Sequence, residues 1–277
     1  MNAAQATAPD GRSIQEAIVA NPVWYHTLEL APGAVTPGWF DLRPIVAGMP
    51  WPDVAGKRCL DVGTYDGFLA FELERRGAAE VVCTDLSRHE DWDWPVDMRA
   101  LGGRRLAELV STRKGEGFRI AKAIAGSNAE RVELSVYDLS PERIGDFDVV
   151  VCGSLMLHLR DPQRALEAIR SVCRGVFLSA EEIRLSLSIG HPRRALAELD
   201  GVGELCQWWV PNAAGHRRMV RAGGFVIERA TRPYCVPFGA AHPPRRGWAS
   251  RRAQLVNRLA AGGDGVPHSA LLARPTG

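Results

Sequence analysis

The chain has 277 residues, of which 46% are hydrophobic, and its formal net charge is +2. A chain near ~300 residues can bury about 75% of its unfolded surface, so one large domain with insertions accounts for this length. No apolar run approaches the roughly 20 residues that span a bilayer, and the N-terminus lacks a basic-then-apolar signal pattern. We therefore expect neither a secreted protein nor a membrane protein.

The charge is distributed unevenly along the chain. Residues 183–277 contain 14 arginines and 5 acidic residues, which gives that segment a net charge of +9. Such an excess is typical of a solvated arginine-rich surface, and it is also what a polyanion or phosphate partner requires.

Six cysteines are present, and none of them forms a Cys-x-x-Cys pair or a Cys/His cluster with zinc spacing. Cys59, Cys83 and Cys152 lie in apolar strand patterns, where a thiol acts as a small core hydrophobe. We therefore expect a cytoplasmic protein without a metal site.

The first 55 residues are predicted to form an N-terminal arm. Ser13 is placed to cap a helix that extends to Ala20, with Glu16 as its capping-box partner. The following residues, up to Asp53, are irregular and rich in Trp, Pro and Gly.

From Gly56 onward the pattern alternates between strands and helices. A helix is predicted over Pro162–Cys173, capped by Asp161. A later helix is predicted over Pro211–Ala222, and an amphipathic segment over Trp248–Leu259. The predicted strands are Arg58–Val62, Glu80–Asp85, Arg131–Tyr137, Phe147–Cys152, Gly175–Ser179, Phe225–Thr231 and His268–Ala273.

This alternation predicts an α/β fold with a mostly parallel sheet covered on both faces. The last two strands lack a convincing crossover helix between them, which predicts an antiparallel addition at the sheet edge. Residues 56–277 would form one domain, with a C-terminal insertion around residues 236–265.

The segment Arg58–Gly67 is the most informative part of the chain, because a strand leads through a tight turn directly into a helix. This layout, followed by a second strand that ends in the acid Asp85, is typical of a nucleotide-type cofactor pocket. A dinucleotide site would favour G-x-G-x-x-G, but here Tyr65 and the acid Asp66 lie inside the turn. A carboxylate there repels a pyrophosphate and suits a phosphate-free ligand with an ammonium group, such as S-adenosylmethionine (SAM).

On these residues the chain resembles the class I SAM-dependent methyltransferases, whose Rossmann-like fold has a mostly parallel seven-stranded sheet. Asp61, Gly63 and Gly67 match the family's acid-x-Gly-x-Gly-x-Gly motif, and Tyr65 replaces the middle glycine. The resemblance implies that Asp85 holds the ribose hydroxyls. The implied cofactor-binding residues are Asp61, Gly63, Thr64, Tyr65, Asp66, Gly67, Asp85, Leu86, Tyr137, Asp138, Cys152, Gly153 and Ser154.

Several of these residues also have a purely structural interpretation. Asp61 and Asp85 could cap the turns that follow them, and Asp138 could be an ordinary turn acid. Tyr65 could serve packing alone.

A narrower similarity is carried by four short segments, which lie at Trp24–Arg43, Asp91–Pro95, Ser154–Pro162 and Trp208–Asn212. Together they resemble the branch that includes the bacterial tRNA wobble-uridine carboxymethyltransferases and related biosynthetic methyltransferases. That branch implies either SAM or a carboxylated SAM as the donor, and it makes tRNA an alternative substrate.

The arm is expected to act as a lid over the cofactor, because aromatic faces attract a sulfonium cation. Trp24 and Tyr25 would then contact the substrate, unless Trp24 only ties the arm to the domain. Trp208 and Trp209 are expected either to line the acceptor pocket or to pack in the core.

His158 is the best candidate for a general base, since it follows the fourth strand, where open α/β sheets bind ligands. His26 in the arm is the second candidate. Glu181 and Glu182 follow the fifth strand and could orient the acceptor. These residues predict a SAM-dependent transfer of methyl to a nitrogen, oxygen or carbon of a small molecule. The alternatives are a tRNA-modifying enzyme, a SAM-binding regulator without catalysis and, least favoured by Asp66, a dehydrogenase.

Overall fold

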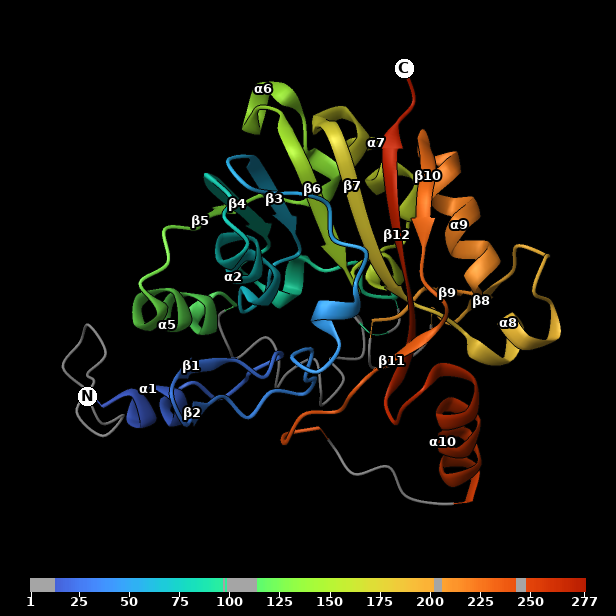
Figure 1. Ribbon diagram of the computed structural model, residues 1–277, viewed down its shortest axis with the longest axis horizontal. Coiled ribbons are helices and arrows are strands. Elements are labelled where there is room, and N and C mark those ends of the chain that lie inside the picture. Colours follow the sequence, from blue (N-terminus) through green and yellow to red (C-terminus); the bar gives the residue numbers. More distant parts are fainter. Residues whose placement is uncertain (1–12, 97, 99–113, 202–205, 243–247) are drawn as a thin grey trace.

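The computed structural model describes residues 13–96, 98, 114–201, 206–242 and 248–277. A single sheet runs through the centre, with its strands in the order β10-β12-β7-β6-β3-β4-β5 (Figure 1). The strands of this path are β3 (Arg58–Val62), β4 (Glu80–Asp85), β5 (Glu130–Glu133), β6 (Phe147–Gly153), β7 (Cys173–Glu182), β10 (Phe225–Ala230) and β12 (Val266–Pro275).

The neighbouring pairs from β5 to β7 are all parallel, whereas β12 is antiparallel to both of its neighbours. The predicted fold class is therefore confirmed. The late strands form an antiparallel pair in which β12 lies between β7 and β10, and β11 (Tyr234–Val236) also pairs with β12.

Helices cover both faces of the sheet because each presents one apolar stripe to it. On one face, α2 (Phe68–Arg75) and α5 (Glu116–Ala125) pack against the sheet together with the arm. On the other face, α7 (Pro162–Val172) and α9 (Ala213–Ala222) bury side chains such as Leu166 and Val220. Further helices in the described part of the chain are α6 (Pro141–Ile144), α8 (Leu185–Gly190) and α10 (Trp248–Ala261).

Several predicted boundaries differ from those of the structure, and local polar side chains explain two of the differences. The predicted strand over Arg131–Tyr137 ends at Glu133, because Ser135 accepts a hydrogen bond from the Tyr137 amide and starts the 3₁₀ turn η4 (Val136–Asp138). The helix predicted from Pro211 begins at Ala213, because the Asn212 side chain caps it by accepting from the Gly215 amide.

The arm begins with helix α1 (Ile14–Ala20), in which the predicted capping box between Ser13 and Glu16 is present. A short hairpin follows, made of β1 (Glu29–Ala31) and β2 (Ala34–Val35). The arm lies with β11 and α10 at the end of the sheet where the parallel strands terminate (Figure 1). The arm therefore covers the sheet edge at which α/β folds bind ligands.

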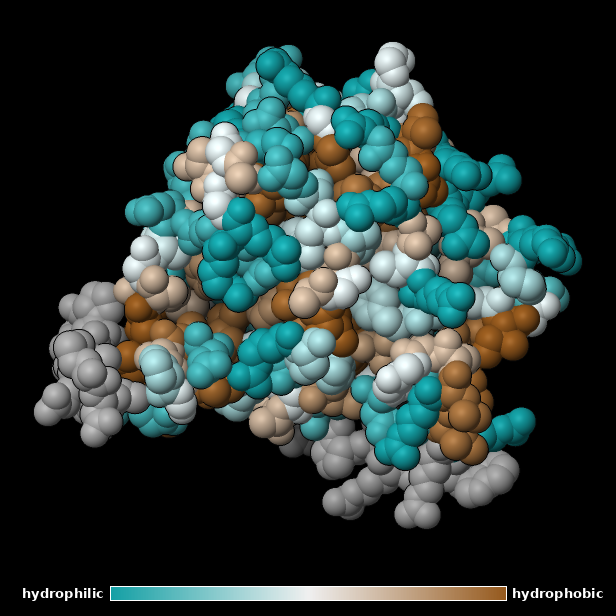
Figure 2. Space-filling view, viewed as in Figure 1, coloured by the Kyte–Doolittle hydropathy of each residue, from teal (hydrophilic) through white to brown (hydrophobic). Residues whose placement is uncertain are grey.

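The outer face of α10 carries exposed apolar side chains, including Leu255 and Leu259 (Figure 2). Within the described part of the chain, no helix combines the length and the apolar character that crossing a membrane requires.

Candidate active site

The glycine turn after β3 depends on left-handed backbone conformations. Gly63 and Gly67 have φ of 79° and 92°, and Tyr65 between them has φ of 48°. An L-residue in this conformation costs about 1–2 kcal/mol. Tyr65 therefore adopts the conformation that the glycine of the family motif would supply, and its backbone amide points to Asp85.

Asp85 is the acceptor on which this part of the site converges. Its Oδ2 accepts the Tyr65 amide at 2.9 Å, and its Oδ1 accepts the Leu86 amide at 2.8 Å. The Nζ of Lys114 lies 2.6 Å from the same Oδ1. Lys114 was missed in the sequence, where it lies far from every motif and shows no distinctive pattern.

Asp61 is buried below the turn, and its Oδ2 has no hydrogen-bond partner among the described residues. Burial raises the pKa of this carboxyl to about 7, and the negative charge of Asp85 adds to the effect. A buried carboxyl oxygen without a partner is costly, and a cationic or donor group of a ligand would satisfy it.

Asp66 has a different position from the one expected. Its Oδ2 accepts the backbone amides of Tyr25 and His26, and its Oδ1 lies so close to Gly117 that a Cβ there would be 2.5 Å away. Burial raises the pKa of Asp66 to about 7. This carboxyl therefore fastens the arm to the glycine turn.

Aromatic rings form the inner side of the arm. The ring of Tyr25 lies 5.1 Å from that of Tyr65 and 5.2 Å from that of Phe40. Phe40 in turn contacts Phe238 and His242, with centroid distances of 6.3 and 5.6 Å. These rings form one cluster that joins the glycine turn, the arm and the loop after β11.

Backbone contacts hold the arm and that loop together. The Gly239 amide donates to the Trp39 carbonyl at 2.8 Å, and the Asp41 amide donates to the Pro237 carbonyl at 3.0 Å. Gly38 must be a glycine, since a Cβ there would lie 2.2 Å from the backbone of His26. These hydrogen bonds join the arm and the loop after β11 into one cover over the glycine turn.

The two other arm residues with predicted roles are buried. Trp24 packs in the core, and its indole donates to the Ile18 carbonyl at 3.0 Å, which is the alternative in which it ties the arm to the domain. His26 packs on Phe68, and burial lowers its pKa to about 3. His26 is therefore neutral, and its role as the second candidate base stays a prediction.

A cavity of about 330 Å³ opens beside the turn, which is within the size range of small-ligand sites. It lies between Tyr65, Asp66, His89, Lys114 and residues 21–23 of the arm, with the first residues of α5 as its floor.

The loop after β6 borders the glycine turn from the other side. A Cβ on Gly63 would lie 3.1 Å from the Leu155 side chain, so these segments touch. Ser154 has φ of 53°, and its Oγ lies 2.8 Å from Nε2 of His268. Cys152 and Gly153 end the strand that carries this loop.

His158 ends the 3₁₀ turn η5 (Met156–His158) in the same loop. Its Nδ1 lies 2.9 Å from the carbonyl oxygen of Cys206, so Nδ1 must carry the proton and Nε2 is left as an acceptor. Burial lowers the pKa of His158. This is the state that a general base needs at neutral pH.

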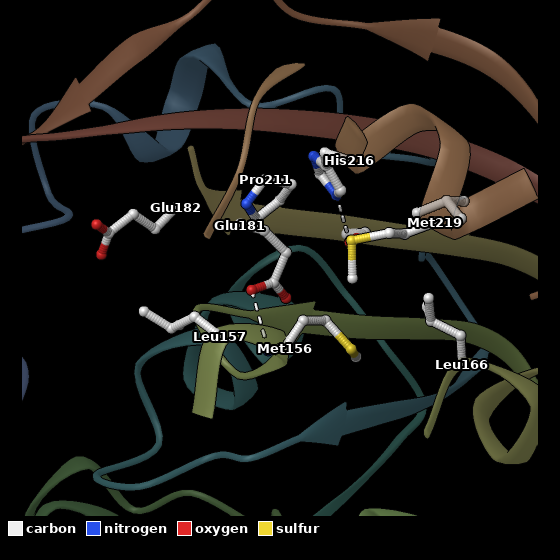
Figure 3. Close-up of a pocket in the computed structure, with 10 residues that line it drawn as sticks. Met156, Leu157, Leu166, Glu181, Glu182, Pro211, His216 and Met219 are labelled. Carbon is white, nitrogen blue, oxygen red and sulfur yellow. Dashed lines mark hydrogen bonds between the residues drawn. The ribbon is translucent and has the colours of Figure 1, made fainter. Parts of the chain in front are cut away.

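Glu181 supports that turn. Its Oε2 accepts the Met156 amide at 3.1 Å, and Figure 3 shows its carboxyl directed to Met156 while Glu182 points away. Burial raises the pKa of Glu181 to about 8. The narrow cavity that Glu181 lines has room for about one water molecule, so it is too small for an acceptor.

Four other predicted site residues make hydrogen bonds or an ion pair away from the glycine turn, and two of them, Tyr137 and Trp208, bond to Asp93 in the loop that follows β4. The Tyr137 hydroxyl donates to Asp93 at 2.5 Å, and the Trp208 indole donates to the Asp93 carbonyl at 2.6 Å. The Trp209 indole donates to the backbone carbonyl of Arg160 at 3.1 Å. Asp138 lies half-exposed, 3.5 Å from Arg143.

Comparison with known proteins places this geometry in a family. Residues 41–225 match a family model described as a methyltransferase domain, which is well over half of the chain. The chain belongs to this family of methyltransferase domains. The prediction of a SAM-dependent methyltransferase domain is therefore confirmed, and no comparison singles out the tRNA branch.

One similar curated protein is the ubiquinone biosynthesis O-methyltransferase of Acinetobacter baylyi, which is 28% identical over 121 residues. The match covers 44% of this chain and 41% of that enzyme, so the chain spans about two fifths of the length of the curated relatives it matches.

Two solved structures are similar at low identity. The SAM-dependent methyltransferase from Mesorhizobium loti has a TM-score of 0.48 and 17% identity, covering 83% of this chain and 97% of that one. The Burkholderia thailandensis 1,6-didemethyltoxoflavin-N1-methyltransferase has a TM-score of 0.45 and 14% identity, covering 80% and 72%.

The residues of this methyltransferase domain fit SAM. The turn between Gly63 and Gly67 offers close backbone approach, and Asp85 offers carboxylate oxygens at the strand end. The unpartnered oxygen of Asp61 suits the ammonium group of the same ligand.

Proposed function

We propose that this methyltransferase domain transfers the methyl group of SAM to a nitrogen, oxygen or carbon of a small-molecule acceptor. The observation that carries the proposal is the buried Asp61 carboxyl below the glycine turn, whose Oδ2 has no hydrogen-bond partner in the described part of the chain. A ligand with a cationic group satisfies this oxygen, whereas a pyrophosphate offers it only acceptor oxygens and leaves it without a partner.

The chain's own residues would hold the donor at three points. Asp85 would accept the ribose hydroxyls, the Gly63–Gly67 turn would lie against the ligand, and Asp61 would face its ammonium group. When bound, SAM supplies a methyl group that is already activated on a sulfonium. The protein therefore needs mainly to align and enclose the reactants, and alignment can contribute roughly 7–11 kcal/mol.

The arm supplies the enclosure. Tyr25 and Phe40 lie over the turn, and Asp66 holds the arm there through two backbone amides. Aromatic faces next to a sulfonium are favourable, and a closed cover excludes water. The same rings would form one wall of the acceptor pocket, which favours a small acceptor.

His158 would accept a proton when the acceptor must lose one. Its Nδ1–H is fixed by the Cys206 carbonyl, so the Nε2 lone pair is the one available for the proton. Glu181 holds the turn that carries His158. The acceptor's nucleophilic atom would then be neutral or anionic as it attacks.

The small-molecule acceptor is also supported by the curated relatives, which are named for ubiquinone biosynthesis O-methylation. The six described cysteines are buried free thiols, which supports a cytoplasmic location. We keep residues 1–55 as the arm and residues 56–277 as the catalytic domain, with an insertion around 236–265.

Titration calorimetry with SAM, S-adenosylhomocysteine (SAH) and NAD tests the donor. We expect SAM and SAH to bind and NAD to give no heat. Absence of binding at millimolar SAM and SAH would contradict the proposal. Product formation across a panel of phenols, amines and activated carbons then separates an enzyme from a SAM-binding regulator, for which SAH binds but no acceptor turns over.

A tRNA substrate is the second candidate, motivated by the net charge of +9 over residues 183–277. It predicts an affinity for tRNA that falls steeply with salt concentration. If the protein does not bind tRNA, or if its affinity for tRNA does not change with salt concentration, tRNA is excluded as the substrate. A carboxylated SAM as donor would be tested by the same calorimetry.

A further inference from the structure

Lys114 has an unusual environment for a lysine. Only 5% of its side chain is exposed, and its Nζ lies 2.6 Å from Oδ1 of Asp85. The ammonium also lies 4.9 Å from the centre of the Tyr65 ring and 4.8 Å from that of Trp92. A carboxylate and two aromatic faces therefore surround this one cation.

The hydrogen-bond capacity of Asp85 limits what else can bind there. A carboxylate accepts about four hydrogen bonds. Among the described residues, the Tyr65 amide, the Leu86 amide and Lys114 use three of them. One position remains, but the two hydroxyls of a ribose need two.

The position of Lys114 adds a steric argument. Tyr65 belongs to the glycine turn and Trp92 to the loop after β4, so the space between their rings lies beside the two segments that hold a nucleoside in this kind of fold. Lys114 also lines the cavity of about 330 Å³ next to the turn. Its side chain thus fills space that an adenosine group would need.

We infer that Lys114 sets the affinity of the donor site by competing with the ribose for Asp85. Donor binding then exchanges one interaction for another. The ammonium of Lys114 leaves Asp85, and the ribose hydroxyls of the donor take its place. The inference rests on the proposed function, because it takes an adenosine-containing donor as the ligand. On this inference Lys114 sets the affinity of the donor site and is not a catalytic residue, since it does not touch the reacting atoms.

Calorimetry with SAH on three proteins tests this exchange: the wild type, Lys114→Met and Lys57→Met. Methionine keeps the apolar stem and removes the charge, and Lys57 is a matched control because it pairs with Asp53 at the surface, far from the turn. We expect Lys114→Met to bind SAH about tenfold more tightly than the wild type, and Lys57→Met to bind like the wild type.

Each other outcome has a defined meaning. Weaker binding by Lys114→Met would show that Lys114 contacts the donor, and equal binding would show that it does not compete; both overturn the inference while the proposed function stands. If no protein binds SAH or SAM, the proposed function fails and the inference fails with it. Lys114→Gln gives a second variant if the methionine does not fold.

Amine labelling of the unmodified protein gives an independent result. In the free protein Lys114 should react with an acylating reagent much more slowly than Lys57, because its ammonium is buried and paired. Addition of SAH should speed the labelling of Lys114, read by mass spectrometry, and leave Lys57 unchanged. Unchanged or slower labelling of Lys114 would contradict the displacement.

Discussion

The two sides of the site are built differently. The donor side comes from one strand–turn–helix–strand unit, and its main groups, from Asp61 to Leu86, are close in sequence. The acceptor side that we propose is assembled from the arm, the loop after β6 and the loop after β11, which meet only in the folded chain. Recognition of a constant donor is thus local, while recognition of the acceptor depends on long-range packing.

Because of this difference, the two sides should tolerate amino-acid substitutions to different extents. The donor side relies on backbone conformation and two carboxyls, so few substitutions are compatible with it. The acceptor side relies on rings carried by loops, and loops tolerate change more readily than the elements they connect. The two sides should therefore respond separately to substitution, and the predictions below test that separation.

The largest effect is expected at His158. Asparagine there keeps a donor for the Cys206 carbonyl but lacks the acceptor nitrogen. Turnover of an acceptor that must lose a proton should fall by about 10²–10⁴-fold while SAH affinity stays constant. His191→Asn, at an exposed position, is the control. Full turnover by the His158→Asn protein would contradict the assignment of His158 as the general base.

Asp85→Asn should produce the opposite pattern. It removes the charge that accepts two backbone amides and, on our account, the ribose hydroxyls, each worth about 1.5–3 kcal/mol as a charged hydrogen bond. SAH affinity should fall by about 100-fold or more in calorimetry. Asp91→Asn, in the 3₁₀ turn η3 (His89–Asp91) that follows β4, removes a surface ion pair with Arg88 and should leave SAH affinity unchanged. Equal losses of SAH affinity in both variants would contradict a specific role of Asp85 in donor binding.

Asp66→Asn should loosen the cover. An amide accepts the Tyr25 and His26 backbone donors more weakly than a carboxyl does, at a cost of about 1–3 kcal/mol. We expect faster hydrogen exchange over residues 25–40 and a higher acceptor KM. Asp41→Asn removes an exposed ion pair with Arg43 in the same arm and serves as the control. Unchanged exchange in Asp66→Asn would show that Asp66 does not hold the arm.

The smallest effect is a pH dependence of stability with opposite signs at two buried groups, His216 on α9 and Asp61 on the donor side. His216, between Ser179 and Ser269, has a pKa lowered to about 3 by burial, against an ordinary value of about 6.5. Its contribution to stability is complete above pH ~6.5 and is lost as the pH falls toward 3. Asp61 has a pKa raised to about 7, so its contribution is present at low pH and is lost as the pH rises through 7.

Urea unfolding at pH 8, 6 and 5 measures this difference. His216→Gln should lower the pH dependence of the unfolding free energy by about 1.4 kcal/mol per pH unit between pH 6 and 5. His191→Gln should leave it unchanged. A parallel pH profile for His216→Gln and wild type would show that His216 titrates normally.

Much of the donor side could be predicted from the sequence because its signals are local. The strand patterns, the turn spacing and the acid Asp85 specify a βαβ unit without knowledge of the rest of the chain. The assignment of Asp66 to the ligand stays a prediction, and the structure adds a contact that the sequence does not reveal, because Asp66 accepts two backbone amides of the arm. Sequence shows that an acid lies in the turn, but it does not show which backbone amides reach it.

The acceptor side could be predicted only in outline. Trp24 and Tyr25 suggested a lid, yet the partners Phe238 and His242 lie about 200 residues away and carry no motif. Lys114 was missed for the same reason, since its ion pair with Asp85 depends on how α5 docks beside β4. Contacts that form only through tertiary packing leave no periodicity to detect.

A crystal structure with SAH bound tests the central claim most directly. The account predicts the ribose hydroxyls on Asp85, the amino group of SAH at Asp61, and the ammonium of Lys114 moved away from Asp85. SAH bound elsewhere, or seated over the turn with its ribose away from Asp85, would contradict the account.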